Sequence, residues 1–267
     1  MTLAGSALIG YSGFVGRSVC AQAPFDERYN SANIDSIRDR QFSLLVCAAP
    51  HGVKRRANSN PDEDWASISR LMEALAGVRT AKAVLLSTVD VYPSPAGVDE
   101  TSPIDHERVT PYGRHRRLLE LFFLDRFPTL VVRLPGIFGD GLQKNMIYDL
   151  LHEDYRFIHP DGVVQYYDLR HLWTDVQTAL GGGLSLLNIA TEPLATREIA
   201  AHVFDVRLNG PAEGTAPRYD MQTRFGAVFG RRDAYLYDKD EVLTDLRSFV
   251  ERERLVTNGR AQDDRSR

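Results

Sequence analysis

Three glycines near the start of the chain stand at a spacing that suits phosphate binding. Gly10, Gly13 and Gly16 follow a short apolar stretch that ends at Ile9, and a helical pattern begins at Phe14. In such a turn the first glycine allows the bend, the second lets the backbone approach a pyrophosphate, and the third lets the helix pack against the strand. The N–H groups and positive end of the helix then hold the phosphates. The pattern predicts a dinucleotide site that includes Gly10, Ser12, Gly13, Phe14, Val15 and Gly16.

The residues after the second expected strand bear on which dinucleotide is bound. An acidic side chain at that strand end binds the ribose hydroxyls of NAD and repels the 2′-phosphate of NADP. This chain has Asn30, Ser31 and Asn33 there, and their side chains can donate hydrogen bonds to a phosphate. The sequence therefore favours NADP. NAD stays open, because Asp35 would lie near the ribose if the strand ended later.

The elements that must position this turn alternate between strands and helices through the first half of the chain. We expect strands at 4–9, 27–31, 42–49, 83–87 and 129–134, and helices at 14–21, 62–76 and 112–126. Such alternation is typical of an α/β fold, here a Rossmann-type doubly wound parallel sheet. The chain between Gly16 and Leu44 is too short for an additional βαβ crossover. We therefore predict that the third outer strand is missing, with strand order 2-1-4-5-6.

After Gly139 the pattern changes to short helical segments separated by turn-rich stretches. We interpret residues 1–139 as the dinucleotide-binding core, to which a strand within 184–190 returns. Residues 140–256 are expected to form mainly a small C-terminal substrate lobe, with a final helix at 239–254. Residues 257–267 are polar and charged, and we expect a flexible tail there.

The composition excludes several classes of protein. The 267-residue chain has a formal net charge of −4, which gives no reason to expect nucleic acid as a partner. No apolar stretch approaches the ~20 residues of a membrane span, and the N-terminus lacks a signal-type segment. The seven histidines show no metal-ligand spacing, and two cysteines are too few for a disulfide framework. We expect a cytoplasmic protein that binds neither a membrane nor a metal.

Three further segments lie where such a sheet places its active site, beyond the carboxyl ends of its strands. They run from Leu86 to Tyr92, from Tyr112 to Arg116 and from Arg133 to Gly139. Together with the glycine turn and the alanines at 48 and 49, their order and spacing resemble the extended short-chain dehydrogenase/reductase superfamily. This superfamily contains sugar-nucleotide epimerases, dehydratases and reductases. The shortened region after the second strand is most similar to the dTDP-4-dehydrorhamnose reductase branch.

The resemblance implies that Thr88 and Tyr112 are the catalytic hydroxyls. A hydride that moves between nicotinamide and a carbinol carbon must be matched by a proton at the oxygen. Tyr112 can give or take that proton while Thr88 hydrogen-bonds the same oxygen. The family has lysine where this chain has Arg116. Arginine supplies a fixed charge and can bind the nicotinamide ribose, but it does not act as a proton relay.

Other positions follow from the resemblance or from their place in the chain. Asp90 resembles an acid that acts as a base in the dehydratases, although a solvated loop aspartate gives the same pattern. Asn145 resembles a substrate-contacting asparagine and equally suits a helix cap. His51 follows the fourth expected strand, near the place of nicotinamide or substrate. The remaining expected cofactor-binding residues are Ala48, Ala49, Pro50, Ser87, Tyr112, Arg116, Pro135 and Ile137.

These observations predict an NADP-dependent oxidoreductase that acts on a sugar or nucleotide sugar, with keto-sugar reduction as the favoured activity. An epimerase or dehydratase with tightly held cofactor uses the same parts. Because of Arg116, a non-catalytic dinucleotide-binding regulatory protein also stays open. The resemblance further implies a homodimer through the helices that begin near Trp65 and Tyr112.

Overall fold

The computed structural model describes residues 5–50, 52–209 and 214–265, with side chains as far as Val256. Six strands form the central sheet, and all the pairings between them are parallel. In spatial order they are β2 (Glu27–Tyr29), β1 (Ser6–Ile9), β3 (Gln41–Cys47), β4 (Arg79–Thr88), β6 (Thr129–Leu134) and β10 (Leu186–Asn188). Within the described residues no strand of this sheet lies beyond β2. The predicted loss of the third outer strand is therefore confirmed. The predicted order 2-1-4-5-6 is also confirmed, because its strands 4, 5 and 6 are β3, β4 and β6 in the labels used here. The returning strand is β10.

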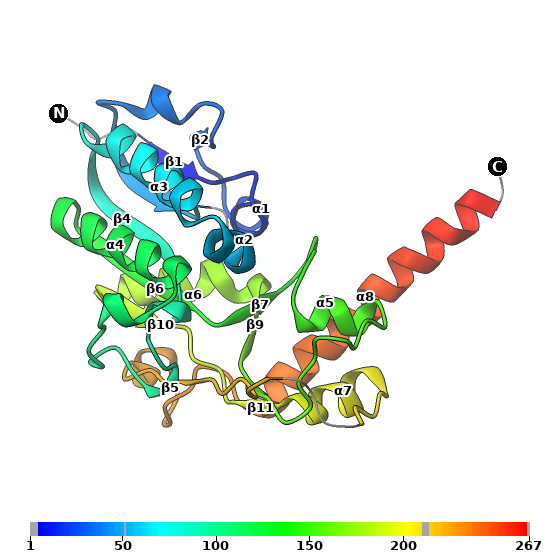
Figure 1. Cartoon of the computed structure of the whole chain (residues 1–267). Coiled ribbons are helices and arrows are strands. Elements are labelled where there is room, and N and C mark those ends of the chain that lie inside the picture. Colours follow the sequence, from blue (N-terminus) through cyan, green and yellow to red (C-terminus); the bar gives the residue numbers. More distant parts are fainter. Residues whose placement is uncertain (1–4, 51, 210–213, 266–267) are drawn as a thin grey trace.

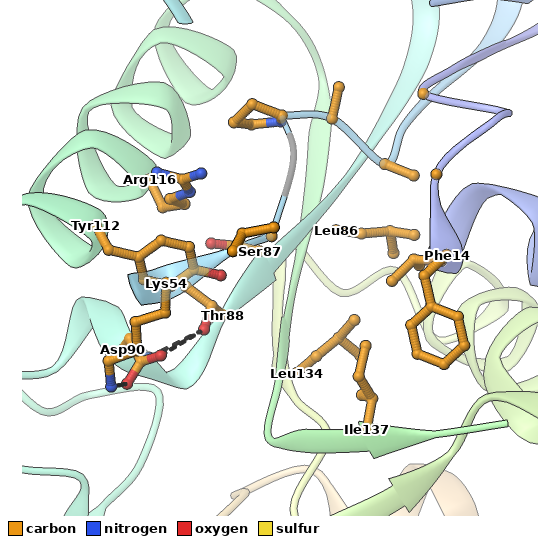
Figure 2. Close-up of a pocket in the computed structure, with 18 of the residues that line it drawn as sticks. Phe14, Lys54, Leu86, Ser87, Thr88, Asp90, Tyr112, Arg116, Leu134 and Ile137 are labelled. Atoms are coloured by element: carbon orange, nitrogen blue, oxygen red, sulfur yellow. Dashed lines mark hydrogen bonds and ion pairs between the residues drawn. The ribbon is translucent and has the colours of Figure 1, made fainter. Parts of the chain in front are cut away.

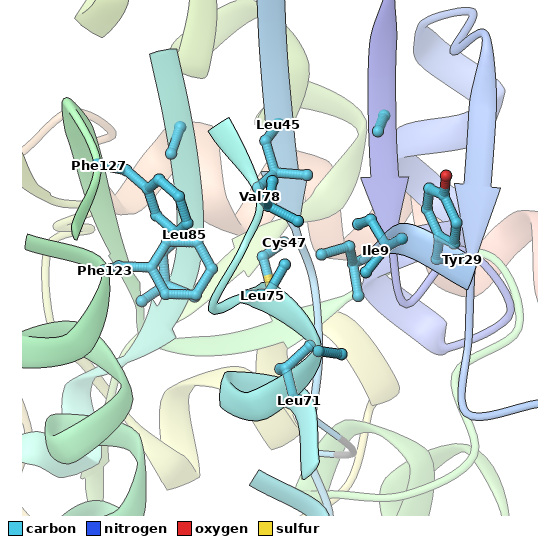
Figure 3. Packing of buried hydrophobic residues seen from close by; sticks show 14 of the residues in the cluster. Ile9, Tyr29, Leu45, Cys47, Leu71, Leu75, Val78, Leu85, Phe123 and Phe127 are labelled. Atoms are coloured by element: carbon cyan, nitrogen blue, oxygen red, sulfur yellow. The ribbon is translucent and has the colours of Figure 1, made fainter. Parts of the chain in front are cut away.

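Helices cover both faces of the sheet (Figure 1). On one face, α3 (Pro61–Leu75) and α4 (Pro111–Arg126) pack over an apolar cluster that includes Leu45, Leu85 and Phe123 (Figure 3). On the other face, α1 (Phe14–Gln22) and α6 (Leu172–Gly181) cover a second cluster. Because both faces are buried, the central strands are nearly continuous apolar runs rather than alternating ones.

The starts of α3 and α4 follow from their sequences. Pro61 and Pro111 stand in the first turn of these helices, where the fixed φ of proline suits a helix and the missing N–H has no intrahelical partner to lose. Asp62, Glu63 and Asp64 add negative charge to the first turn of α3, which the helix dipole favours. The predicted homodimer across these two helices stays a prediction.

The second half of the chain adds a lobe with its own apolar cluster. Its helices are α5 (Met146–Leu151), α7 (Thr196–Phe204) and α8 (Lys239–Arg265), and in Figure 1 the end of α8 extends away from the body. Short strand pairs complete it and its junction with the core: β7 (Gly136–Phe138) with β9 (Tyr166–Asp168), β8 (Val163–Val164) with β11 (Leu194–Ala195), and β5 (Ala96–Val98) with β12 (Asp220–Met221).

Some elements differ from the sequence-based expectation. Helix α8 continues to Arg265 instead of ending at Arg254. Two helices, α2 (Lys54–Ser59) and α6, were not predicted. The division into a 1–139 core, a 140–256 lobe and a 257–267 tail stays a prediction. No described helix combines the length and the apolar character that crossing a membrane requires.

Candidate active site

A cavity of about 970 Å³ lies along the carboxyl ends of β1, β3, β4 and β6. The glycine turn, α2, α3 and α4 contribute to its wall, and the lobe adds Val164, Tyr166 and Tyr219. The structure brings most of the predicted site residues together in this wall. They are Gly10, Ser12, Gly13, Phe14, Val15, Asn30, Ser31, Ala48, Ala49, Pro50, Ser87, Thr88, Asp90, Tyr112, Arg116, Pro135, Ile137 and Asn145.

Three predicted positions are not part of the described wall. His51 lies outside the described residues, and neither Gly16 nor Asn33 lines the cavity. A Cβ on Gly16 would lie 2.0 Å from the Gly10 carbonyl oxygen, so this glycine serves the close packing of α1 on the turn. The Asn33 side chain closes the turn after β2 by accepting a hydrogen bond from the Asn30 amide at 2.7 Å.

The glycine turn has the backbone geometry that an anion site requires. Gly10 has a φ of +83°, and a Cβ there would lie 2.9 Å from the Ala48 carbonyl oxygen. Gly13 precedes α1 with no side chain over the helix end, and the first turn of α1 contains no acid. The first N–H groups of a helix have no intrahelical partners, and the helix dipole favours negative charge there. The turn therefore fits the diphosphate of a dinucleotide.

Charge is distributed very unevenly along the cavity wall. Asp90 is the only acidic residue in its described part, whereas six basic side chains line it. Because the whole chain has a net charge of −4, positive charge is concentrated in the cavity. A cleft lined by one sign of charge raises the local concentration of oppositely charged ligands. The basic residues are Arg17, Lys54, Arg55, Arg70, Arg116 and Lys144.

Tyr112 and Thr88 lie close together in the wall (Figure 2). Tyr112 is in the first turn of α4 and Thr88 ends β4, and the Thr88 hydroxyl lies near enough to the phenol to lower its pKa. This closeness depends on Gly113, where a Cβ would lie 2.0 Å from the Asp90 carbonyl oxygen. Glycine at this position lets the first turn of α4 pack directly on the segment that follows β4.

The environment of Tyr112 keeps its phenol protonated. Burial raises the pKa of Tyr112 above its usual 10, and the positive charge of Arg116 and the neighbouring Thr88 hydroxyl offset this only in part. The side chain has 8% of its surface exposed. Tyr112 can therefore donate a proton to a ligand oxygen at neutral pH.

Arg116 is ion-paired inside the site. Its guanidinium carbon lies 4.1 Å from the centre of the Tyr112 ring, and its Nη1 is 2.5 Å from Asp64 Oδ2. His115 Nδ1 lies 2.7 Å from the same carboxylate oxygen. Because Asp64 neutralises part of the guanidinium charge, Arg116 favours a phenolate less than an unpaired cation would. Asp64, which precedes Arg116 by 52 residues, was not among the predicted site residues.

Asp90 is also ion-paired. Lys54 Nζ lies 2.6 Å from Asp90 Oδ1 (Figure 2), and Tyr219 of the lobe lies beside this pair in the cavity wall. The other Asp90 oxygen is 3.5 Å from Thr88 Oγ1. Tyr219 was not among the predicted site residues. No group of three or more His, Cys, Asp and Glu side chains in the described part of the chain is placed to hold a metal ion.

Asn145 has the structural role that its sequence position also allowed. Its Oδ1 accepts hydrogen bonds from the first-turn amides of α5, and its Nδ2 donates to the Ile137 carbonyl at 2.8 Å. The neighbouring Lys144 donates to the Gly52 carbonyl at 2.5 Å. This contact joins the segment before α5 to the segment after β3 across the cavity.

A buried network supports the catalytic end of the cavity. Glu120 of α4 is fully buried and accepts hydrogen bonds from Ser87 at 2.5 Å, Arg117 at 2.8 Å and Arg133 at 2.8 Å. These bonds join α4 to the carboxyl ends of β4 and β6. They therefore fix the helix that presents Tyr112 to the cavity.

No protein-family model matches this sequence, and no curated protein matches it in a sequence search. Solved structures match it in shape. A dTDP-4-dehydrorhamnose reductase from Clostridium acetobutylicum has a TM-score of 0.70 at 14% identity, over 93% of this chain and 99% of that one. A UDP-glucose 4-epimerase from Thermotoga maritima, with UDP-glucose, has a TM-score of 0.69 at 14% identity, over 94% and 99%.

A third structure, MoeE5 in complex with UDP-glucuronic acid and NAD, has a TM-score of 0.70 at 17% identity, over 94% of this chain and 100% of that one. The chain has the fold of the extended short-chain dehydrogenase/reductases. The resemblance seen in the sequence is thus confirmed in the fold, and the reductase branch is among the structures matched. The cavity of this chain lies in the crevice at the carboxyl ends of its strands, which is where doubly wound sheets bind their ligands.

Proposed function

We propose that this protein is a nicotinamide-dinucleotide-dependent oxidoreductase that reduces a keto group of a sugar or nucleotide sugar. The observation that carries this proposal is the buried phenol of Tyr112 beside Thr88, in a basic cavity that also contains the glycine turn. Structures of the same fold include a dTDP-4-dehydrorhamnose reductase and a complex with NAD and a UDP-sugar, which supports this class of reaction and substrate.

The residues of the cavity divide the work of such a reaction. The amides of Phe14 and Val15 would hold the diphosphate of the cofactor, which supplies a hydride when bound, whereas the Gly13 amide donates to the Gly10 carbonyl within the turn at 3.0 Å. Thr88 Oγ1 hydrogen-bonds the substrate carbonyl oxygen and orients it, and Tyr112 Oη transfers its proton to that oxygen. A developing alkoxide is a stronger base than a phenolate, so a raised phenol pKa still permits this transfer.

After the transfer, the positive charges of Arg116 and Lys54 stabilise the Tyr112 phenolate that remains. Both cations lower the pKa of Tyr112, although neither outweighs burial. Reduction uses the protonated phenol as its starting state, whereas oxidation of an alcohol would need the phenolate. The protonated phenol is therefore compatible with the reductive direction.

The favoured cofactor is NADP. The cavity end beside β2 is lined by Asn30 and Ser31, and no acidic side chain of the described residues lines that end. The feature that binds the ribose hydroxyls of NAD and repels the 2′-phosphate of NADP is thus missing from this wall.

Asp90 supports a second candidate, a nucleotide-sugar dehydratase or epimerase. Its carboxylate lies in the wall next to Thr88, where a base could act at a sugar carbon. Lys54 forms an ion pair with this carboxylate at 2.6 Å, and this pairing competes with proton abstraction by Asp90. Such an enzyme would return its cofactor to the starting state and retain it through purification.

The test is turnover of NADPH with a panel of keto-sugar nucleotides, followed by the absorbance of the reduced nicotinamide. We expect net NADPH oxidation with at least one substrate and a rate about 10²–10⁴ times lower in Tyr112→Phe. The exposed Tyr155 provides the matched control, Tyr155→Phe, which keeps the wild-type rate. Sugar product without net oxidation of NADPH would establish the second candidate. NADPH binding without turnover of any substrate would indicate the non-catalytic regulatory protein.

A further inference from the structure

The cavity end beside β2 holds polar side chains that the proposed reaction does not use. Ser12, Asn30, Ser31 and Arg70 all line the cavity. Asn30 Oδ1 accepts a hydrogen bond from the Ala32 amide at 2.9 Å, which turns its Nδ2 group toward Ser12 Oγ at 3.5 Å. The cavity wall therefore carries two hydroxyls, an amide and a guanidinium that can donate hydrogen bonds to a ligand.

Arg70 reaches this place from α3, far along the chain from the turn after β2. Its Nη2 lies 2.5 Å from Asp35 Oδ2. A guanidinium carries five N–H donors in a planar fork, so this contact leaves donors for a second anion. Such a fork matches the geometry of a phosphate.

Asp35 is not placed to bind a ribose. It does not line the cavity, and its second oxygen lies 3.1 Å from Arg38 Nη2, so two guanidinium groups engage its carboxylate. The one acidic side chain in the described wall, Asp90, lies next to Thr88 instead. The cavity end beside β2 therefore attracts an anion and lacks the acid that would repel one.

We propose that Arg70 is the principal residue of a subsite for the 2′-phosphate of NADP, with Ser12, Asn30 and Ser31 as further donors. Asp35 positions its guanidinium from outside the cavity. This subsite depends on the dinucleotide site proposed above and accounts for the choice between the two dinucleotides. A phosphomonoester dianion gains charge-assisted hydrogen bonds from Arg70 that a ribose hydroxyl does not.

Calorimetric titration of the full-length protein tests the subsite without any turnover. The probes are NADPH against NADH, and 2′,5′-ADP against 5′-AMP, which lacks only the 2′-phosphate. The wild type should bind the 2′-phosphorylated member of each pair about tenfold or more tightly, as expected for a charge-assisted contact. Arg70→Gln should remove most of this preference by lowering NADPH affinity far more than NADH affinity, because NADH lacks the charge-assisted contact.

Arg38 provides a matched control because it also pairs with Asp35 but does not line the cavity. Arg38→Gln should keep the wild-type preference, and Asp35→Asn should leave NADH affinity unchanged. A fall in NADH affinity in Asp35→Asn would show that Asp35 binds the ribose and would overturn the subsite. Equal binding of NADPH and NADH by the wild type would do the same while leaving the proposed reaction intact. No binding of any dinucleotide would contradict the reaction as well.

Discussion

Two single-methyl additions to the glycine turn separate binding from folding. In Gly13→Ala the new Cβ would lie 3.4 Å from the Gly10 carbonyl oxygen, which is ordinary contact, and φ at this residue is −76°. The free energy of unfolding should therefore change by about 1 kcal/mol or less. In Gly16→Ala the Cβ would lie only 2.0 Å from the same backbone oxygen. Overpacking of this kind costs about 1–3 kcal/mol, and occasionally more.

The effects on NADPH affinity should be large even where the fold is intact. The methyl of Gly13→Ala occupies the space through which the diphosphate approaches the amides of α1. Loss of two charge-assisted hydrogen bonds at about 1.5 kcal/mol each lowers affinity roughly a hundredfold. Urea unfolding gives the stability of both variants, and fluorescence titration with NADPH gives the affinity. If folded Gly13→Ala bound NADPH as the wild type does, the diphosphate would not lie against this turn.

Three further perturbations have defined outcomes. Burial raises the pKa of Tyr112 above 10. A pH–rate profile for keto-sugar reduction should therefore show no fall in kcat/KM from titration of Tyr112 below pH 10. Loss of the Tyr112 proton near pH 7 would contradict its assignment as the proton donor. Glu120→Ala leaves the buried charge of Arg133 without its carboxylate and should lower the free energy of unfolding by about 3–5 kcal/mol in urea; a smaller loss than about 1 kcal/mol would show that the pair is not a main support of the site. The carboxylate of Asp245 raises the pKa of His171 above 6.5. The stabilisation from this pair is therefore complete below pH 6.5 and is lost as pH rises through the folded-state pKa of His171. Asp245→Asn should remove this pH dependence of the free energy of unfolding, which unfolding curves at several pH values would reveal.

The parts of the site that were visible in the sequence are those built from local patterns. The glycine turn needs only a strand, three spaced glycines and a helix, and Tyr112 and Arg116 stand on one helix face. The missing outer strand followed from chain length alone, because too few residues separate Gly16 from Leu44.

The ion pairs that define the site were beyond such patterns. Lys54 reaches Asp90 over 36 residues, and Arg70 reaches Asp35 over 35. Partners at these separations depend on how α2 and α3 pack against the sheet, and no local spacing reports that packing. The substitution of lysine by arginine at position 116 could be read from the chain, but the carboxylate that accompanies it could not.

Helix α6 shows a different kind of failure. Its buried residues Leu172, Val176 and Ala179 have the spacing of an amphipathic helix, so the signal was present. The segment lies among turn-rich stretches, and no helix was predicted there. The position of Tyr219 had no such signal, because the lobe carries it to the cavity through tertiary packing alone.

The most direct measurement is a crystal structure of the protein with NADPH. We expect a dinucleotide along the carboxyl ends of the strands, with its diphosphate on the amides of Phe14 and Val15. We also expect the 2′-phosphate at Arg70 and the nicotinamide beside Tyr112 and Thr88. A dinucleotide bound elsewhere, or a cavity without NADPH at saturating concentration, would contradict the proposed dinucleotide site.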